Sequence, residues 1–378
     1  KDIIILDGRP FEEYSKMSIP GSVCCPNAEI PFRISELIKS SNTEIIINCA
    51  GRTRSIIGAQ ALINFGIKNK VYALENGTQG WFLANLKLDH GKIKFLDKTP
   101  KNEKINELRG KIVNLLENKV EIIDFNQAQK LINDKNITTY VFDVRTSSNQ
   151  KNKLSKLRNV PGGQLVQATD KYIGVLKSHV IVFDDGDLVR AGMTALWLKK
   201  MNYHCYVVNE SPKRMKNLNL KHDVNFRANQ INLIKLENLK NLKDTLIFDI
   251  RNSVDYCKKR IKKSIWTNRL IITGEIPHYV KAIIIVTNDL PKASLIISDL
   301  QEKDLKYVVQ VFHWNETDVE YYLDYIDTTE VELDEKFIDF NFHTYLRHQG
   351  NKEHAKNYLK WETDLIKNMD EEERGFFR

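Results

Sequence analysis

The chain has 378 residues, of which 42% are hydrophobic and 28% are charged, a composition typical of globular proteins. No stretch approaches the roughly 20 apolar residues that a membrane-spanning helix needs, so no membrane partner is expected. The formal charge of +8 is spread over many lysines without a basic stripe interleaved with aromatic residues, so no nucleic-acid partner is expected either. The length predicts more than one domain.

The cysteine content indicates the redox environment. The chain contains five cysteines, at Cys24, Cys25, Cys49, Cys205 and Cys257. An odd number without a C-x-x-C pair argues against a disulfide framework and a zinc site, and it favours a reducing, cytoplasmic location. The first residues already resemble an interior strand, at residues 2–6. We therefore expect the chain to begin partway into a longer protein, which leaves a signal peptide open.

A repeated pattern divides most of the chain into three similar segments. In each segment an apolar strand ends in an aspartate that is followed two positions later by an arginine. These pairs are Asp7 and Arg9, Asp143 and Arg145, and Asp249 and Arg251. At a similar distance after each pair, a second apolar strand ends at Cys49, Asp184 and Thr287, respectively. A helical pattern and a further strand follow in every segment.

The alternation of strands and helices predicts the α/β fold class, with tandem domains that each have a mainly parallel sheet and helices on both faces. The predicted domains are residues 1–92, 119–217 and 228–326, followed by a helical C-terminal extension at 327–378. A charged, helical connector is expected at residues 98–118.

Local signals predict how several helices begin, end and pack. Asp124 is the expected N-cap of the helix that opens the second domain, and Gly66 and Asn202 are expected at helix C-termini because they tolerate left-handed backbone. In the C-terminal extension, one apolar helix face is predicted from Tyr358, Leu359, Leu365, Ile366 and Met369.

The segment Cys-Ala-Gly-Arg-Thr-Arg-Ser, residues 49–55, lies between an apolar strand at residues 44–48 and a helical pattern. Backbone N–H groups at the N-terminus of a helix favour an anion, and we expect Arg52 and Arg54 to add positive charge beside Cys49. Such surroundings favour the thiolate, which is the nucleophilic form of cysteine. In parallel sheets, ligands bind beyond the carboxyl ends of the strands, where Cys49 is expected to lie.

The first segment resembles a rhodanese domain over nearly its whole length. The matching pieces occur in the expected order at residues 6–10, 13–14, 19–23, 49–55 and 74–81. The second and third segments resemble degenerate copies of the same domain. The whole chain is similar to bacterial proteins that string four rhodanese domains together, with the first of the four absent here.

The resemblance implies a thiosulfate sulfurtransferase without a cofactor or metal. In this family a loop cysteine takes a sulfane sulfur from thiosulfate or a similar small-molecule donor and holds it as a persulfide. It then passes the sulfur to cyanide or another thiophilic acceptor, including a protein acceptor. Cys49 matches the catalytic cysteine. The positions that match the substrate-binding loop are Ala50, Gly51, Arg52, Thr53, Arg54 and Ser55, and those of the structural motif are Asp7, Arg9, Gly80 and Trp81.

Two other functions compete with this interpretation. Cys-dependent phosphatases share the fold, but their signature places five residues between cysteine and arginine. Only four residues separate Cys49 from Arg54, and Ser55 stands where the signature requires arginine, so the loop favours sulfur over phosphate. The other alternative is a sulfur carrier or an interaction scaffold, in which Cys49 receives sulfur from a partner protein.

The remaining loops and cysteines are predicted to have no catalytic role. Asp184 and Thr287 stand at the cysteine position of the second and third domains and cannot form a persulfide, so both domains are predicted to be inactive. Cys24 and Cys25 are either resolving thiols or small residues that line the sheet, and the absence of adjoining charged residues that would activate a thiolate favours the structural role. Cys24, Cys25 and Cys205 are interpreted as structural, and Cys257 as incidental in a surface helix.

Overall fold

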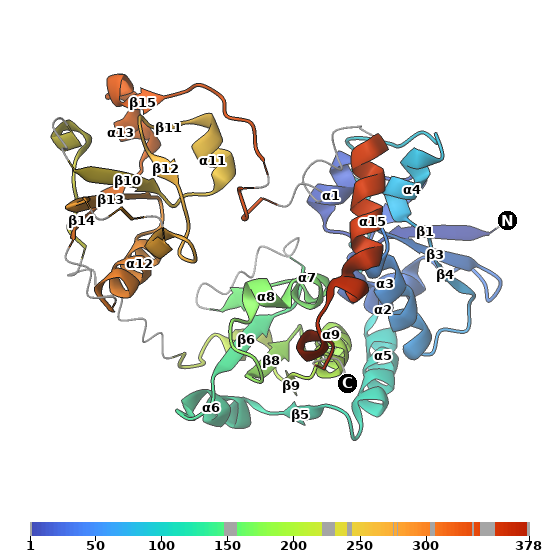
Figure 1. Cartoon of the computed structure of the whole chain (residues 1–378). Helices are drawn as coiled ribbons and strands as arrows, with labels where there is room; N and C mark the ends of the chain where they lie inside the picture. Colours follow the sequence, from blue (N-terminus) through green and yellow to red (C-terminus); the bar gives the residue numbers. More distant parts are fainter. Residues whose placement is uncertain are drawn as a thin grey trace. The chain divides into compact units, whose positions relative to one another are not determined.

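The computed structural model forms two compact units (Figure 1). One unit comprises Lys1–Lys221 together with Leu346–Arg378, and the other comprises His222–Tyr345. Within the residues that are described, no helix combines the length and apolarity needed to cross a bilayer. The described residues are 2–146, 157–220, 231–239, 244–274, 276–277, 279–302, 307–334, 336–340 and 352–375.

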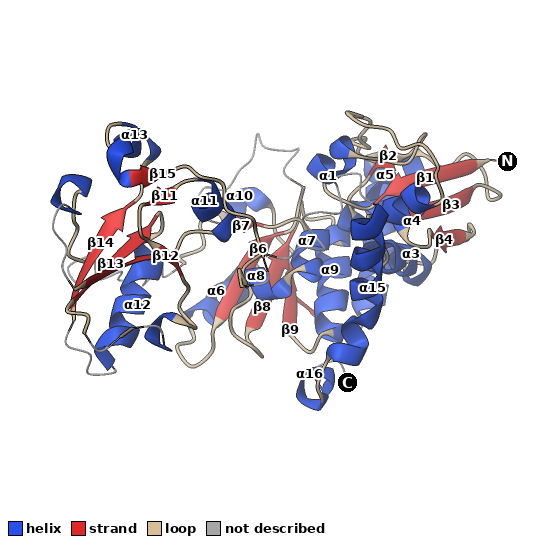
Figure 2. Cartoon of the chain, turned by 45° about the horizontal axis from the view of Figure 1, so that its top comes forward, coloured by secondary structure: helices blue, strands red, loops and turns tan. Residues whose placement is uncertain are grey.

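The first sheet has four parallel strands in the order β2-β1-β3-β4 (Figure 2). The strands are β1 (Ile3–Asp7), β2 (Val23–Cys24), β3 (Glu44–Asn48) and β4 (Val71–Ala73). The helices are α1 (Phe11–Lys16), α2 (Ile30–Arg33), α3 (Thr53–Asn64) and α4 (Gly77–Leu83). Alternate side chains of β1 pack on opposite faces, because Leu6 joins the core with α2 and α3 whereas Ile5 packs near Trp81 of α4.

The second sheet has five parallel strands in the order β5-β9-β8-β6-β7. They are β5 (Glu121–Ile123), β6 (Thr139–Asp143), β7 (Arg158–Asn159), β8 (His179–Phe183) and β9 (His204–Val208). The helices are α5 (Asn102–Leu116), α6 (Phe125–Asn133), α7 (Gly162–Gln167), α8 (Thr169–Tyr172), α9 (Val189–Lys200) and α10 (Pro212–Met215). The predicted cap at Asp124 is confirmed as part of a capping box with Gln127.

A continuous hydrophobic core joins the elements around the first and second sheets. Phe32 and Phe65 from the first segment belong to the same buried cluster as Ile112 of α5 and Leu198 of α9. Because α5 contributes to this cluster, the predicted connector is a packed element of the unit.

The second unit contains a sheet in the order β12-β10-β13-β14, all parallel. Its strands are β10 (Thr245–Asp249), β12 (Ile265–Trp266), β13 (Ala282–Thr287) and β14 (Val308–His313). A separate antiparallel pair is formed by β11 (Arg260–Ile261) and β15 (Ile326–Asp327). The helices are α11 (Ser253–Lys258), α12 (Leu290–Glu302) and α13 (Glu316–Glu320).

The three sheets share one arrangement around the aspartate-arginine pairs. In each sheet the strand that ends in the aspartate lies second in the order β2-β1-β3-β4, β7-β6-β8-β9 or β12-β10-β13-β14. The pairs are buried ion pairs with N–O distances of 2.7, 2.6 and 2.7 Å for Arg9–Asp7, Arg145–Asp143 and Arg251–Asp249, respectively. The predicted left-handed positions are also confirmed, with φ of 79° at Gly66 and 67° at Asn202.

The C-terminal extension differs from its prediction. Helices α15 (Lys352–Asn368) and α16 (Glu371–Gly375) are present, but residues 330–334 and 336–340 are not helical. Phe337 and Phe340 instead pack beside Cys257 and Trp266, and this burial outweighs helix propensity. The boundary predicted at residue 228 lies outside the described residues, and the domain boundaries stay predictions.

The predicted apolar face of the extension is also wrong in part. Leu365 and Ile366 are 38% and 73% exposed. The covered face of α15 is formed by Ala355 and Tyr358, which are buried, and by Glu362. These three residues follow one another at three and four positions, the spacing that places side chains on one face of a helix.

Candidate functional site

Cys49 lies directly beyond the carboxyl end of β3, between that strand and α3. It is buried, with 1% of its surface exposed. Asn48 precedes it and donates from Nδ2 to Asp7 Oδ2 over 3.2 Å, so the buried Asp7–Arg9 pair supports the base of the loop. Ligands of parallel sheets bind beyond the carboxyl ends of the strands, and the Cys49 thiol lies at this edge, as predicted.

Helix α4 holds the carbonyl side of the Cys49 loop. The amides of Thr78 and Gln79 donate to the carbonyl oxygens of Cys49 and Ala50 over 2.9 and 3.0 Å. Gly77 permits this approach because it has φ of +51°, and a Cβ there would lie 2.2 Å from Cys49 O. Since the peptide unit is planar, a carbonyl fixed toward α4 directs the N–H of the next residue away from it.

The loop retains free amides at the N-terminus of α3. Within the described part of the chain, the backbone N–H groups of Ala50, Gly51, Arg54 and Ser55 have no hydrogen-bond partner. The first amides of a helix lack intrahelical acceptors and carry the positive end of the helix dipole. The loop can therefore stabilise an anion attached to Cys49.

Arg54 is paired with a carboxylate, which the sequence did not indicate. It is buried and forms a bidentate pair with Glu13 of α1, with Nη1–Oε1 and Nη2–Oε2 distances of 2.8 and 2.9 Å. Burial opposes its charge, but the hydrogen bond and charge of Glu13, together with Cys49, raise the pKa of Arg54 above its usual range. Arg52, by contrast, is exposed.

Glu362 of α15 contacts the same loop, which the sequence analysis missed. Its Oε1 accepts from Arg52 N at 3.2 Å, Thr53 N at 3.0 Å and Thr53 Oγ1 at 2.9 Å. Gly51 permits the approach, because a Cβ there would lie 2.1 Å from Glu362 Oε2 and 2.8 Å from Tyr358 Cε1. Helix α15 runs beside α4 in Figures 1 and 2. No local pattern signals a contact between residues 310 positions apart.

The two other residues of the predicted structural motif support α4. A Cβ at Gly80 would lie 2.7 Å from Asn76 Cβ, so only glycine fits there without displacing its neighbour. Trp81 Nε1 donates to Lys87 O over 3.0 Å and fixes the turn after α4. Both residues act through the helix that holds the Cys49 carbonyl.

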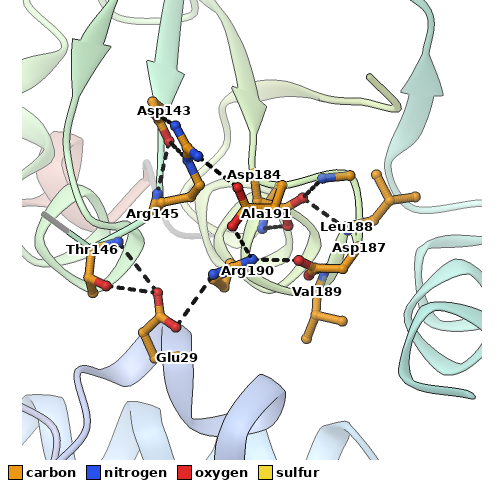
Figure 3. Close-up of polar contacts among 12 residues, drawn as sticks. Glu29, Asp143, Arg145, Thr146, Asp184, Asp187, Leu188, Val189, Arg190 and Ala191 are labelled. Atoms are coloured by element: carbon orange, nitrogen blue, oxygen red, sulfur yellow. Dashed lines mark hydrogen bonds and ion pairs between the residues drawn. The ribbon is translucent and has the colours of Figure 1, made fainter. Parts of the chain in front are cut away.

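The equivalent loop of the second sheet is filled by its own carboxylate (Figure 3). Asp184 Oδ1 accepts from the amides of Gly186 and Leu188 at 2.9 and 3.0 Å, and its Oδ2 accepts from Ala191 N at 3.0 Å. Asp184 is fully buried. Three backbone donors of this loop are therefore bound by the loop's own carboxylate.

Arginines and further carboxylates surround Asp184, most of them buried (Figure 3). Arg190 contacts Asp187 at 2.5 Å, Asp185 at 2.9 Å and Glu29 at 3.6 Å. Burial and the charge of Asp184 raise the pKa of Asp187 to about 7, against the opposing effect of Arg190. When acids outnumber the guanidiniums beside them, their mutual repulsion favours the protonated form of one of the acids.

The loop after β13 presents a hydroxyl where the first domain has its thiol. Thr287 Oγ1 accepts from Asp289 N at 2.9 Å and donates to Asp289 O at 3.0 Å, which closes a local turn. Among the residues with described positions, no cluster of three or more His, Cys, Asp or Glu side chains could hold a metal ion.

The four other cysteines are buried thiols. Burial raises the pKa of each of them, and that of Cys205 reaches about 12. A raised pKa disfavours the reactive thiolate, in agreement with structural roles. Cys257 lies in α11, whose Asp255 and Lys258 are exposed, but its own side chain is 3% exposed and packs with Trp266, Phe337 and Phe340.

Comparisons with known proteins agree with the repeated fold. The family model described as rhodanese-like domain matches residues 1–84. A crystal structure of a thiosulfate sulfurtransferase from Pseudomonas aeruginosa matches with 29% sequence identity and a TM-score of 0.76. That match covers 100% of this chain and 72% of the other.

Two curated proteins match shorter stretches. One is an HTH-type transcriptional regulator of Mycobacterium tuberculosis, 31% identical over 90 residues, which are 24% of this chain and 39% of the relative. The other, from Bacillus subtilis, is named as a candidate sulfur carrier and is 40% identical over 77 residues, 20% of this chain and 40% of the relative. The chain thus spans about two fifths of the length of these curated relatives. Residues 1–84 belong to the rhodanese-like family, within a chain of multi-domain rhodanese-like architecture.

Proposed function

We propose that this chain is a sulfurtransferase that moves a sulfane sulfur from a small-molecule donor to a thiophilic acceptor through a persulfide on Cys49. The observation that carries the proposal is the position of Cys49 at the head of a loop in which four amides, at the N-terminus of α3, have no partner among the described residues. The similarity to a protein named thiosulfate sulfurtransferase supports the same class of reaction.

The reaction requires one nucleophile and a stabilised anion. The Cys49 thiolate attacks the outer sulfur of a donor such as thiosulfate, the donor S–S bond breaks, and sulfite leaves with the electron pair. The terminal sulfur of the persulfide then carries negative charge, which the amides of Ala50, Gly51, Arg54 and Ser55 can stabilise. Cyanide or a thiolate attacks that sulfur and releases the Cys49 thiolate.

The second and third loops are proposed to take no part in this transfer. Asp184 and Thr287 offer no sulfur nucleophile, and the Asp184 carboxylate occupies the amides of its own loop. The first domain is therefore the proposed catalytic domain, and the other two are proposed to be inactive copies.

A second candidate function is a sulfur carrier that receives its sulfur from a partner protein. The observation that favours it is the 40% identity to a protein named as a candidate sulfur carrier. The two functions differ in how fast Cys49 takes sulfur from a small molecule. Multiple turnover with thiosulfate and cyanide supports the enzyme, whereas loading only from a protein persulfide supports the carrier.

Replacement of Cys49 tests the proposal directly. After exposure to a sulfane-sulfur donor, the intact mass of the wild-type protein should increase by one sulfur, and cyanide should remove the addition. Cys49→Ala should abolish the addition, because the other thiols are buried with raised pKa values. Cys257→Ala is the matched control and should load like wild type. Cyanide-sensitive loading of Cys49→Ala would refute the assignment.

A further inference from the structure

A carboxylate supplied by the C-terminal helix lies on the anion-binding side of the Cys49 loop. Glu362 Oε1 is bound by the amides of Arg52 and Thr53 and by the Thr53 hydroxyl at distances of 2.9–3.2 Å. Its second oxygen, Oε2, is buried and has no hydrogen-bond partner among the described residues. A buried oxygen of a charged group without a donor is costly, so packing alone gives no reason to place a glutamate here.

The backbone of the loop is shaped to receive this side chain. Gly51 leaves the space in which Glu362 Oε2 and Tyr358 Cε1 approach, since a Cβ at position 51 would lie 2.1 and 2.8 Å from them. A larger residue would require the Glu362 carboxylate and the Tyr358 ring to shift. The glycine that follows Ala50 thus permits the contact with α15.

Two carboxylates contact the loop when α15 is in place. Glu13 binds both terminal nitrogens of Arg54, and Glu362 accepts from the backbone N–H of Arg52. Thiosulfate carries two negative charges, and it must approach Cys49 beside the fixed charge of Glu362. Like charges in a partly desolvated site repel strongly, because the effective dielectric constant is lower than that of water.

We propose that Glu362 determines which sulfur donors the Cys49 site accepts, by disfavouring dianionic thiosulfate and favouring a persulfide of low charge. The inference rests on the proposed sulfurtransferase function. With a persulfide R–S–SH, the Cys49 thiolate attacks the outer sulfur, the S–S bond breaks, and R–S⁻ leaves with the electron pair. The proton stays on the transferred sulfur, so Cys49 becomes Cys–S–SH.

Steady-state kinetics with thiosulfate and cyanide test the charge of Glu362. Glu362→Gln keeps an oxygen for the loop amides and removes the negative charge. It should lower the KM for thiosulfate about tenfold while kcat changes less than about twofold. Asp364→Asn is the matched control, because Asp364 lies on the same helix and pairs with Lys367 at 2.8 Å. The control should keep the wild-type KM, and an unchanged KM in Glu362→Gln would overturn the proposal.

Alkylation of Cys49 tests the same charge without any sulfur transfer. The alkylation rate of Cys49 with the anion iodoacetate is divided by its rate with neutral iodoacetamide. Both rates are measured on the whole protein at low ionic strength, from the peptide that contains Cys49. In Glu362→Gln this ratio should rise about tenfold over wild type and Asp364→Asn. An equal rise with both reagents, or no rise with either, would contradict a charge effect. If no sulfane donor loads wild-type Cys49, the proposed function fails, while the alkylation ratio still decides the effect of Glu362.

Discussion

At the scale of single residues, the loops after β3 and β8 differ in what lies against their backbone amides. The amides of Ala50, Gly51, Arg54 and Ser55 have no partner among the described residues, whereas those of Gly186, Leu188 and Ala191 are bound by the Asp184 carboxylate. A fixed carboxylate and a cysteine-bound persulfide are both anions that suit the N-terminus of a helix. The second loop therefore places its own carboxylate where the first loop is proposed to hold a transferable sulfur.

The buried acids around Asp184 predict a pH-dependent stability that Asp187 controls. Because the folded state raises the pKa of Asp187 to about 7, it retains a proton that the unfolded chain, with a pKa of about 3.9, releases. The contribution of protonated Asp187 to the free energy of unfolding is fully present below about pH 4, and it is lost as the pH rises toward about 7. The free energy of unfolding of wild type should thus fall by about 1–3 kcal/mol relative to Asp187→Asn over this range.

Urea unfolding at a series of pH values measures this difference. Asp170→Asn is a suitable control, because Asp170 is an exposed acid in the same sheet domain. It should follow wild type at every pH. A constant difference between wild type and Asp187→Asn from about pH 4 to about pH 8 would contradict the raised pKa of Asp187.

At the scale of elements, the connector α5 is fixed by its contact with α9. Gly192 of α9 faces Ile112 and Leu116, and a Cβ there would lie 2.6 Å from Ile112 Cγ1 and 3.1 Å from Leu116 Cδ1. Two helices approach closely when one of them has a glycine at the contact. The connector is thus packed against α9 as part of a shared core.

Two glycine substitutions distinguish this contact from helix propensity. Gly192→Ala should lower the free energy of unfolding by about 1–3 kcal/mol, because the methyl group overlaps Ile112. Gly110→Ala, in an exposed and open position of α5, should raise it by about 0.5–1 kcal/mol. Chemical denaturation measures both values. Stabilisation by Gly192→Ala would show that α5 and α9 are not in contact.

At the scale of the whole molecule, the first unit is assembled from both ends of the chain. Residues of α15 complete it, although they follow the second unit in sequence. Tyr358 and Glu362 reach the Cys49 loop from this helix. The Cys49 loop is therefore contacted by a segment outside the residues that match the rhodanese-like family model.

Removal of the segment after residue 345 should uncover the loop. A chain that ends there lacks α15, so the neutral reagent iodoacetamide should alkylate Cys49 about tenfold faster than in the full chain. Glu362→Gln, which keeps the helix, should leave the iodoacetamide rate near that of wild type. Circular dichroism verifies that the shortened chain is folded. An unchanged rate in a folded, shortened chain would show that α15 does not restrict access.

Local patterns in the sequence predicted much of this structure. The aspartate-arginine pairs, the capping box at Asp124 and the left-handed Gly66 depend on residues a few positions apart, so local chemistry determines them. The parallel strands followed from continuous isoleucine and valine runs.

The missing features depend on contacts between distant residues. Nothing near Arg54 indicates that Glu13 binds its guanidinium, and nothing near Cys49 indicates Glu362. The exposure of Leu365 and Ile366 has the same cause. The neighbouring elements determine which face of α15 is buried, and the helical period of the sequence alone does not reveal that face.

The distance along the chain between Arg52 and Glu362 has a consequence for biosynthesis. The two residues are separated by 310 positions. A ribosome that adds about 5–20 residues per second needs roughly 15–60 s to translate that interval, and N-terminal domains generally fold first. The newly made first domain can thus fold while its thiol loop still lacks the covering helix. We expect small oxidants and sulfur donors to reach Cys49 of the nascent chain faster than Cys49 of the finished protein.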